Sequence, residues 1–263
     1  MKTKKTIINL IVLSISFITS CKKTEVGPQG ETGAQGSQGP SLTGNIKGYV
    51  NHYDYNNSKI LSDLAGDSIF IDGTSMVAVT NASGSYSFTN LTTGTYNFTI
   101  KRLGYGTDKL QSLQFVGGGD SFHNINLAKT PTLNITTISA TQTSTSASVM
   151  GINITGTVTA QPFAQTVIIY CGNVNSSTSN SSPSNYSILF TINVPANAST
   201  FNKLIPTNDL YDAGFVSGNT CAFAGYLLGS SVNSASNYID IESNKLVYSA
   251  ISPIPATSTV IVQ

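Results

Sequence analysis

Histidine is the side chain that most often moves protons in enzyme active sites, and this chain contains two, His52 and His123. A Ser-His-Asp triad needs a histidine held between a nucleophile and a carboxylate. No Gly-x-Ser-x-Gly motif marks such a nucleophile in the sequence. Both histidines fall at the ends of predicted strands, so we expect surface positions for them. The sequence therefore predicts a protein that is not an enzyme.

Two groups of oxygen-bearing side chains have a spacing that metal ions use. Asp54, Asn56 and Ser58 alternate like the first ligands of a calcium loop, but a lysine follows and no carboxylate stands where the last ligand belongs. Asp240 and Glu242 would share one face of an extended segment, where a metal ion could bridge them. The alternative is that they are a pair of solvated acids. Motifs for zinc, for phosphate and for Cys-x-x-Cys chemistry are absent from the sequence. We expect neither a metal nor a cofactor.

The charge balance excludes another class of function. Charged residues make up 10% of the chain and the formal net charge is +1. Proteins that bind a nucleic-acid backbone carry clustered lysine and arginine, and no such cluster occurs outside the N-terminal segment. We expect no nucleic-acid partner.

The first twenty residues have the pattern of a targeting segment. Lysines precede an apolar run, residues 7–18, that is too short to span a bilayer comfortably. The run ends in Ile-Thr-Ser-Cys, which resembles a bacterial lipobox. The resemblance implies that residues 1–20 are a lipoprotein signal peptide and that Cys21 becomes a lipidated N-terminus, anchored in a membrane without crossing it. The alternative is an ordinary secretory signal with a chance cysteine.

A repeat follows the predicted anchor. Residues 27–41 are five Gly-x-y triplets in strict register. The pattern resembles collagen, where only glycine fits at the crowded axis. Five triplets with two prolines give little triple-helical stability, so we expect residues 21–43 to be the lipidated cysteine and an extended, monomeric linker of about 50 Å. A short trimeric stalk is the alternative.

The stretch from residue 81 to residue 105 predicts a hairpin buried on one face, because turn signals separate two runs in which aromatic and polar residues alternate. The stretch contains a Ser-Gly turn, then Tyr-x-Phe, then Asn-Leu-x-x-Gly-x-Tyr-x-Phe, and then Leu-Gly-Tyr. The order and spacing of these motifs resemble the carboxypeptidase regulatory-like domain, a transthyretin-type β-sandwich. The resemblance covers about residues 44–130 and brings no catalytic residue with it. It implies architectural roles for Gly84, Tyr86, Gly94 and Tyr96.

Period-two patterning predicts further strands in both halves of the chain. The first half has expected strands at residues 45–53, 68–71, 75–80, 85–88, 95–102, 110–116 and 122–128. The second has them at residues 132–138, 147–157, 166–171, 186–194, 200–205, 220–228 and 245–249. The run from Leu204 to Tyr226 weakly resembles a fibronectin type III strand corner, although Cys221 and Ala222 stand where that family has a tyrosine. We expect an all-β fold of two tandem β-sandwich domains, residues 44–130 and 131–263.

Covalent chemistry is expected at three further residues. Cys171 and Cys221 remain as a pair after lipidation of Cys21, lie on predicted strands that would be neighbours in a fibronectin-like sandwich, and belong to a compartment that permits disulfides. They form either a disulfide or two buried free thiols. Ser68 lies in Asp-Ser-Ile, which resembles a sequon for O-glycosylation of exported bacterial proteins.

The predicted function is that of a non-catalytic, lipid-anchored outer-membrane protein of the cell envelope, on the surface or on the periplasmic face. It would act as a scaffold or adhesion module whose sandwich loops bind a protein or a glycan. The alternative is an accessory glycan-capture lipoprotein of a polysaccharide-uptake system. The chain has no tryptophan, the commonest stacking platform for sugars, but it has twelve tyrosines. The loops in question are residues 54–66, 116–121, 173–185 and 229–238.

Overall fold

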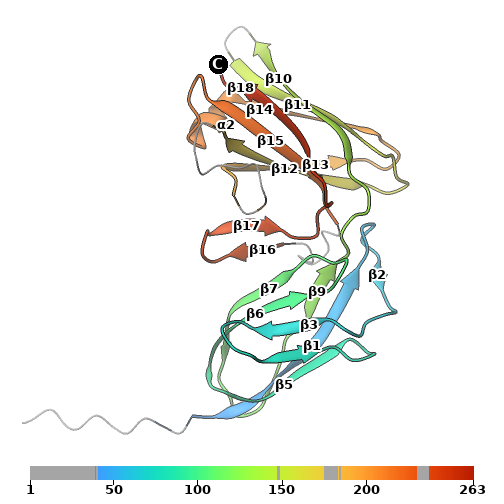
Figure 1. The fold of residues 1–263 in the computed structure, drawn as a ribbon, viewed down its shortest axis with the longest axis vertical. Helices are drawn as coiled ribbons and strands as arrows, with labels where there is room; N and C mark the ends of the chain where they lie inside the picture. The colour runs from blue at the N-terminus through green and yellow to red at the C-terminus, as the bar shows by residue number, and fades with distance from the viewer. Residues whose placement is uncertain (1–38, 40, 147–148, 175–182, 184, 230–236) are drawn as a thin grey trace, which may run out of the picture. The chain divides into compact units, whose positions relative to one another are not determined.

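The computed structural model describes residues 39, 41–146, 149–174, 183, 185–229 and 237–263. The signal peptide, Cys21 and almost all of the Gly-x-y triplets lie outside the described residues. Residues Ser41–Gln263 form one compact unit, in which nearly all regular structure is β-strand (Figure 1). In the described part of the chain no helix is long and apolar enough to cross a membrane. The predicted all-β fold of tandem sandwiches is confirmed.

Two sheets form the first sandwich. One sheet contains β1 (Thr43–Tyr53), β2 (Lys59–Ile60), β5 (Ser85–Thr92), β8 (Asp120–Phe122) and β9 (Ile125–Ala128). The other has the order β4-β3-β6-β7, from β3 (Ser68–Ile71), β4 (Val77–Val79), β6 (Gly94–Lys101) and β7 (Asp108–Phe115). The inward residues of both sheets form one core that includes Ile46, Ile69, Phe88, Phe98 and Leu127. The two strands predicted in residues 81–105 are present as β5 and β6, but the predicted hairpin is wrong, because β5 pairs with β1 in one sheet and β6 pairs with β3 and β7 in the other. Gly84, at φ +78°, lies in the turn before β5.

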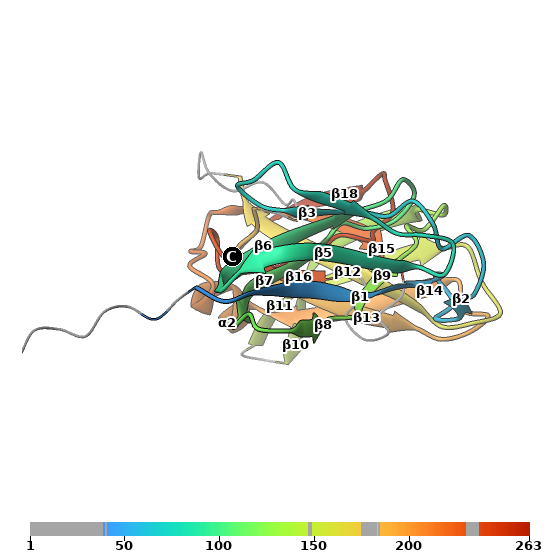
Figure 2. The same cartoon turned by 90° about the horizontal axis from the view of Figure 1, so that it is seen from below.

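Strand β1 is the centre of its sheet. It pairs antiparallel with β5 on one side and parallel with β8 and β9 on the other (Figure 2). The single strand predicted at residues 122–128 is wrong, because the chain breaks into β8 and β9 where it passes Gly48. A Cβ atom at Gly48 would lie 1.8 Å from the carbonyl oxygen of His123. The Tyr86 hydroxyl donates a hydrogen bond to the same oxygen at 2.7 Å, which holds the break in place.

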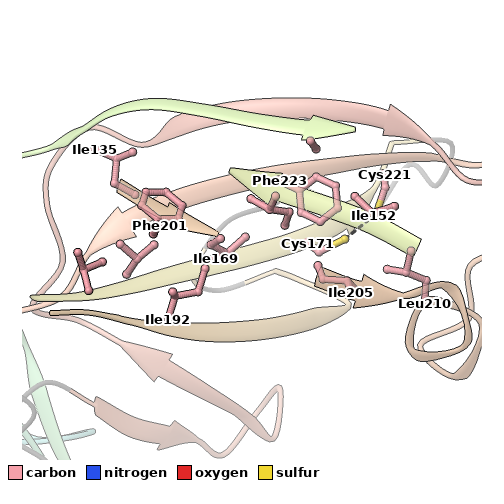
Figure 3. Close-up of a cluster of buried hydrophobic side chains, with 14 of the residues drawn as sticks. Ile135, Ile152, Ile169, Cys171, Ile192, Phe201, Ile205, Leu210, Cys221 and Phe223 are labelled. Atoms are coloured by element: carbon pink, nitrogen blue, oxygen red, sulfur yellow. Dashed lines mark hydrogen bonds between the residues drawn. The ribbon is translucent and has the colours of Figure 1, made fainter. Parts of the chain in front are cut away.

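The second sandwich also has two sheets. One contains β10 (Ile135–Ser146), β11 (Val149–Val158) and β14 (Thr200–Pro206), and the other has the order β13-β12-β15-β18. The bounds of the latter four are Gln165–Asn173 for β12, Ile188–Val194 for β13, Thr220–Leu227 for β15 and Ala256–Ile261 for β18. Figure 3 shows the core between these sheets, where Ile152, Ile169 and Phe223 are almost completely buried.

Three elements of the second half were not predicted. A short helix, α2 (Thr207–Asp212), follows Pro206. Strand β18 completes the sheet next to β15, with Cys221 opposite Val260. Strand β16 (Asn237–Asp240) pairs with β17 (Lys245–Tyr248), which is the strand predicted at residues 245–249. No described sheet combines strands from before and after Pro131.

Candidate functional site

The outer face of the β1–β5–β8 sheet presents large aromatic side chains to solvent. Residues alternate along β1, so that Ile46 and Val50 are buried while Tyr49, between them, is 50% exposed. Phe122 on β8 is 68% exposed. Tyr49 and Phe122 line the same hollow, and exposed apolar side chains that gather in one place can mark a binding site.

Two hollows adjoin Tyr49, and its side chain lines both. The larger one, of about 370 Å³, is lined by residues that include Lys47, Val79, Asn81, Ser85, Ser87 and Phe122. The smaller one, of about 290 Å³, is lined by residues that include Asn51, Lys59, Leu61, Ser83 and Asn124. We call these two hollows and the side chains that line them the Tyr49 face.

The backbone beneath the Tyr49 face is held on both sides. The Tyr49 N–H donates to Asn124 Oδ1 at 3.0 Å, and the close approach of His123 to Gly48 fixes the neighbouring strand. Burial raises the pKa of Tyr86, whose ring lies under the face and whose hydroxyl is already hydrogen bonded. The exposed ring of Tyr49 therefore stands on backbone that is ordered before any ligand binds.

The charges on this side of the sheet largely cancel. Lys47 Nζ lies 2.7 Å from Asp120 Oδ2, and Asn45 Nδ2 donates to Asp120 Oδ1 at 2.6 Å. The hydrogen bonds from Lys47 and Asn45 hold the pKa of the Asp120 carboxyl below its usual value. What remains around the aromatic rings is mainly the neutral donors and acceptors of serine and asparagine.

His52 is not the surface residue that the sequence predicts, since its side chain and that of Asp67 are both 0% exposed. His52 Nε2 lies 2.9 Å from Asp67 Oδ1 and 3.1 Å from Oδ2. Arg102 Nη1 approaches Asp67 Oδ1 at 3.3 Å, and the Thr80 hydroxyl donates to Oδ2 at 3.0 Å. The prediction failed because Asp67, fifteen residues away, is hydrogen bonded to the imidazole, and this bond offsets the free-energy cost of burying it.

A histidine beside a carboxylate is also the acid–base half of a catalytic triad. Here the pair has no access to solvent, and its carboxylate is shared with Arg102 and Thr80. The four residues tie β1, β3, β4 and β6 together at one end of the sandwich. His52 Nδ1 has no hydrogen-bond partner in the described part of the chain. His123 is half-buried, and its Nε2 lies 2.7 Å from Ser121 Oγ.

Ser68, the predicted glycosylation site, begins β3 and is half-buried. It pairs with Val79 on one side and with Lys101 on the other. Its neighbour in the sequon, Asp67, is the buried carboxylate of the His52 network. Glycosylation of Ser68 stays a prediction.

Cys171 and Cys221 meet in the core of the second sandwich, on the adjacent strands β12 and β15 (Figure 3). Both are buried, with their Sγ atoms 2.6 Å apart. The hydrogen bond with Cys221, together with burial, raises the pKa of the Cys171 thiol. The strand pairing predicted for the two cysteines is present, and their disulfide stays a prediction.

The suggested metal ligands are used by the protein itself. Asp54 Oδ1 accepts the Asn56 and Ser58 N–H groups at 3.2 and 2.8 Å, and Asp240 Oδ1 accepts from Ser243. Among the described residues, no group of three or more histidine, cysteine, aspartate or glutamate side chains is arranged to hold a metal ion.

The predicted recognition loops give little to compare with the Tyr49 face. Residues 173–185 and 229–238 lie mostly outside the described residues. The segment 54–66 contains β2, and its Leu61 and Leu64 line the smaller hollow. Tyr49 and Phe122 were not predicted as surface residues, although alternation along the predicted strand at residues 45–53 places the Tyr49 side chain on the opposite face from Val50.

The open face of the second sandwich offers a contrasting surface. A hollow of about 460 Å³ is lined mainly by hydroxyl-bearing and amide side chains, among them Thr137, Ser139, Thr155 and Asn202. Its aromatic residue, Phe201, is only 6% exposed and belongs to the core. This surface lacks an accessible ring, so the Tyr49 face is the better candidate for binding.

Comparison with known families supports one part of the sequence analysis. Residues 62–128 match the model of the carboxypeptidase regulatory-like domain. The predicted resemblance is confirmed for this segment. A search of the curated proteins found no match.

Solved structures give distant similarities. A putative carbohydrate binding protein from Bacteroides uniformis is 11% identical, with 84% of this chain and 99% of that chain covered and a TM-score of 0.28. A DUF3823 family protein from Parabacteroides merdae is 13% identical, with 82% and 100% covered and a TM-score of 0.25. A cohesin–X-dockerin complex from Acetivibrio cellulolyticus is 22% identical, with a TM-score of 0.29. The match covers 33% of this chain and 58% of that chain. At these scores the similarities assign no function.

Proposed function

We propose that this protein is a non-catalytic, lipid-anchored binding protein of the cell envelope that recognises its ligand with the Tyr49 face. The observation that carries the proposal is the exposure of Tyr49 and Phe122 beside two hollows on an ordered sheet. Interaction sites are enriched in aromatic side chains that pack against a partner at low conformational cost. The site is therefore a sheet face, where the sequence alone pointed to loops.

Anchoring rests on the lipobox-like Ile-Thr-Ser-Cys motif and on the linker that follows it. Lipid at Cys21 would hold the protein at the outer membrane, and residues 21–43 would keep the first sandwich away from the lipid headgroups. Replacing Cys21 with serine should abolish incorporation of labelled fatty acid and leave an unprocessed or soluble protein. Label retained in Cys21→Ser would overturn this part of the proposal.

The proposal that the protein has no turnover is supported by the burial of the one close histidine–carboxylate contact recorded among the described residues, His52–Asp67. A catalytic site needs titratable groups that converge where a substrate can reach them. Purified protein should leave peptide, ester and glycan substrates intact. Hydrolysis that disappears on changing His123 or Ser121, with the fold unaffected, would show that the protein is an enzyme.

The binding face is tested by site-specific photo-cross-linking in cells. A benzophenone amino acid at Thr89, the next exposed residue after Ser87 on the same face of β5 and not one of the residues that line the larger hollow, should form adducts with the ligand because benzophenone inserts into the C–H bonds of proteins and of sugars alike. The same amino acid at Thr155, an exposed strand residue of the second sandwich, is the control. Adducts at Thr155 with none at Thr89 would refute the assignment of the face.

A further inference from the structure

We propose that the Tyr49 face is a carbohydrate-binding site, in which a sugar chain passes over the Tyr49 ring and places one sugar in each of the two hollows. The inference rests on the proposed function and names the ligand class for the same face. Four features of the face support it: the aromatic rings, the neutral polar groups, the cancelled charges and the rigid backbone.

The aromatic rings suit the apolar side of a sugar. A pyranose ring has a face of C–H groups that can lie flat on an aromatic ring, while its hydroxyls project from the rim. Tyrosine combines an apolar body with a polar tip, and the Tyr49 ring is half exposed between the hollows. Phe122, which is 68% exposed, supplies a second ring at the larger hollow.

The polar groups around the rings have donors to spare. Asn81 Oδ1 accepts hydrogen bonds from the Ser83 and Ser85 N–H groups at 3.0 and 3.1 Å. Asn124 Oδ1 accepts the Tyr49 N–H. In both asparagines the amide oxygen accepts hydrogen bonds from the protein, so the NH2 group is the part of the side chain that can donate to a ligand hydroxyl. Ser87, exposed on β5, adds a hydroxyl that can donate or accept.

The charge of the face fits an uncharged ligand. Lys47, the charged side chain at the larger hollow, is neutralised by Asp120 at 2.7 Å. Lys59 is the charged side chain at the smaller hollow, and it is exposed, so that its ammonium group can remain in water. A nucleic acid or a strongly acidic protein would need a field of cations that the face does not have.

The size and rigidity of the face point the same way. The hollows measure about 370 and 290 Å³, near the lower end of the range of about 300–1,000 Å³ that is usual for small-ligand sites. Strand backbone fixed by Gly48 and Asn124 loses little freedom on binding. Two shallow hollows separated by a tyrosine match a chain of rings better than they match a flat protein surface.

The test uses purified, lipidated full-length protein in detergent on an array of immobilised plant, fungal and bacterial glycans. The protein should retain at least one glycan family, and Tyr49→Ala and Phe122→Ala should each weaken that binding about tenfold or more, as expected for a central aromatic anchor. Tyr49→Phe keeps the ring and should bind within about threefold of the unchanged protein. Phe70→Ala is the matched control, because Phe70 is an exposed phenylalanine of the same sandwich on the other sheet.

A loss of affinity caused by misfolding is separated by a second variant. Ser87→Arg leaves both rings in place and fills the larger hollow, so it should also abolish binding while hydrogen exchange of the core strands stays unchanged. Binding to a neutral glycan should change little between 50 and 500 mM salt, because no ion pair with the ligand is involved.

The outcomes distinguish failure of the carbohydrate assignment from failure of the proposed binding face. If the array retains no glycan while cross-links at Thr89 identify a protein, the carbohydrate assignment is overturned and the proposed binding face stands. If a glycan binds but neither Tyr49→Ala, Phe122→Ala nor Ser87→Arg weakens it, the site lies elsewhere and both proposals are wrong.

Discussion

Replacing Asp67 with alanine should be among the most damaging single changes in the first sandwich. The carboxylate is 0% exposed and receives His52 Nε2, Arg102 Nη1 and the Thr80 hydroxyl. Without it, His52 would have a hydrogen-bond partner at neither ring nitrogen, since Nδ1 already lacks one in the described part of the chain. Removal of one member of a buried pair typically costs about 3–5 kcal/mol. We expect a loss of that size.

Asp63→Ala is the matched control. Asp63 Oδ2 lies 2.7 Å from Arg102 Nη2, so both carboxylates bind the same guanidinium, but the Asp63 side chain is 83% exposed. Exposed ion pairs typically contribute about 0–1 kcal/mol because water screens them. Both variants remove a carboxylate from Arg102, and Asp67→Ala also removes the buried partner of His52 and Thr80.

Hydrogen exchange read by mass spectrometry is the appropriate assay, because a chain of two sandwiches need not unfold in one step. Peptides from β1, β3 and β6 should lose protection in Asp67→Ala by about 3–5 kcal/mol of opening free energy, while peptides from β12 and β15 stay unchanged. Equal effects of Asp67→Ala and Asp63→Ala would refute the view that burial gives the network its strength.

Three further predictions concern other parts of the fold. Burial raises the pKa of Asp108 from 3.8 to about 6. The folded state therefore holds this proton more tightly than the unfolded state, and stability falls as pH rises from about 4 to 6. Asp108→Asn should remove that fall and stabilise the protein at pH 7 by about 1–3 kcal/mol, measured in parallel denaturant titrations. Gly48→Ala should cost about 3 kcal/mol or more, because its methyl group would meet a backbone oxygen at 1.8 Å, and Gly119→Ala, where a methyl meets nothing within 4 Å, should cost far less in the same assay. If Cys171 and Cys221 form a disulfide, the intact mass of the periplasmically expressed protein should be lower before reduction than after it by the mass of two hydrogens. Equal masses before and after reduction, once any adducts of the reducing agent are subtracted, would show two thiols.

The strands β5 and β6 could be predicted because their signals are local, but their assignment to two different sheets could not. Gly84 occupies the turn before β5 with a positive φ, and Tyr86 and Phe88 are almost fully buried, as the alternation implies. Turn residues and period-two patterning act over a few residues and are therefore visible in the sequence. The same reasoning located β1, whose alternation contains the information that Tyr49 faces outward.

The remaining features depend on contacts between distant residues. His52 is buried because Asp67 pairs with it across the sandwich, and no pattern around either residue reports that contact. The break between β8 and β9 follows from the close approach to Gly48. The short helix α2 begins directly after Pro206 without a side-chain cap, so its start carries no capping signal. Tertiary packing decided each of these cases.

The central claim, recognition through the Tyr49 face, is tested most directly by hydroxyl-radical footprinting of the full-length protein with and without the ligand recovered from the Thr89 cross-link or the glycan array. The account predicts that Tyr49 and Phe122 become protected from oxidation when the ligand is bound, while Phe70 and Tyr211, which are 39% and 43% exposed, are oxidised at the same rate in both samples. Unchanged oxidation of Tyr49 and Phe122 in the saturated complex would contradict it.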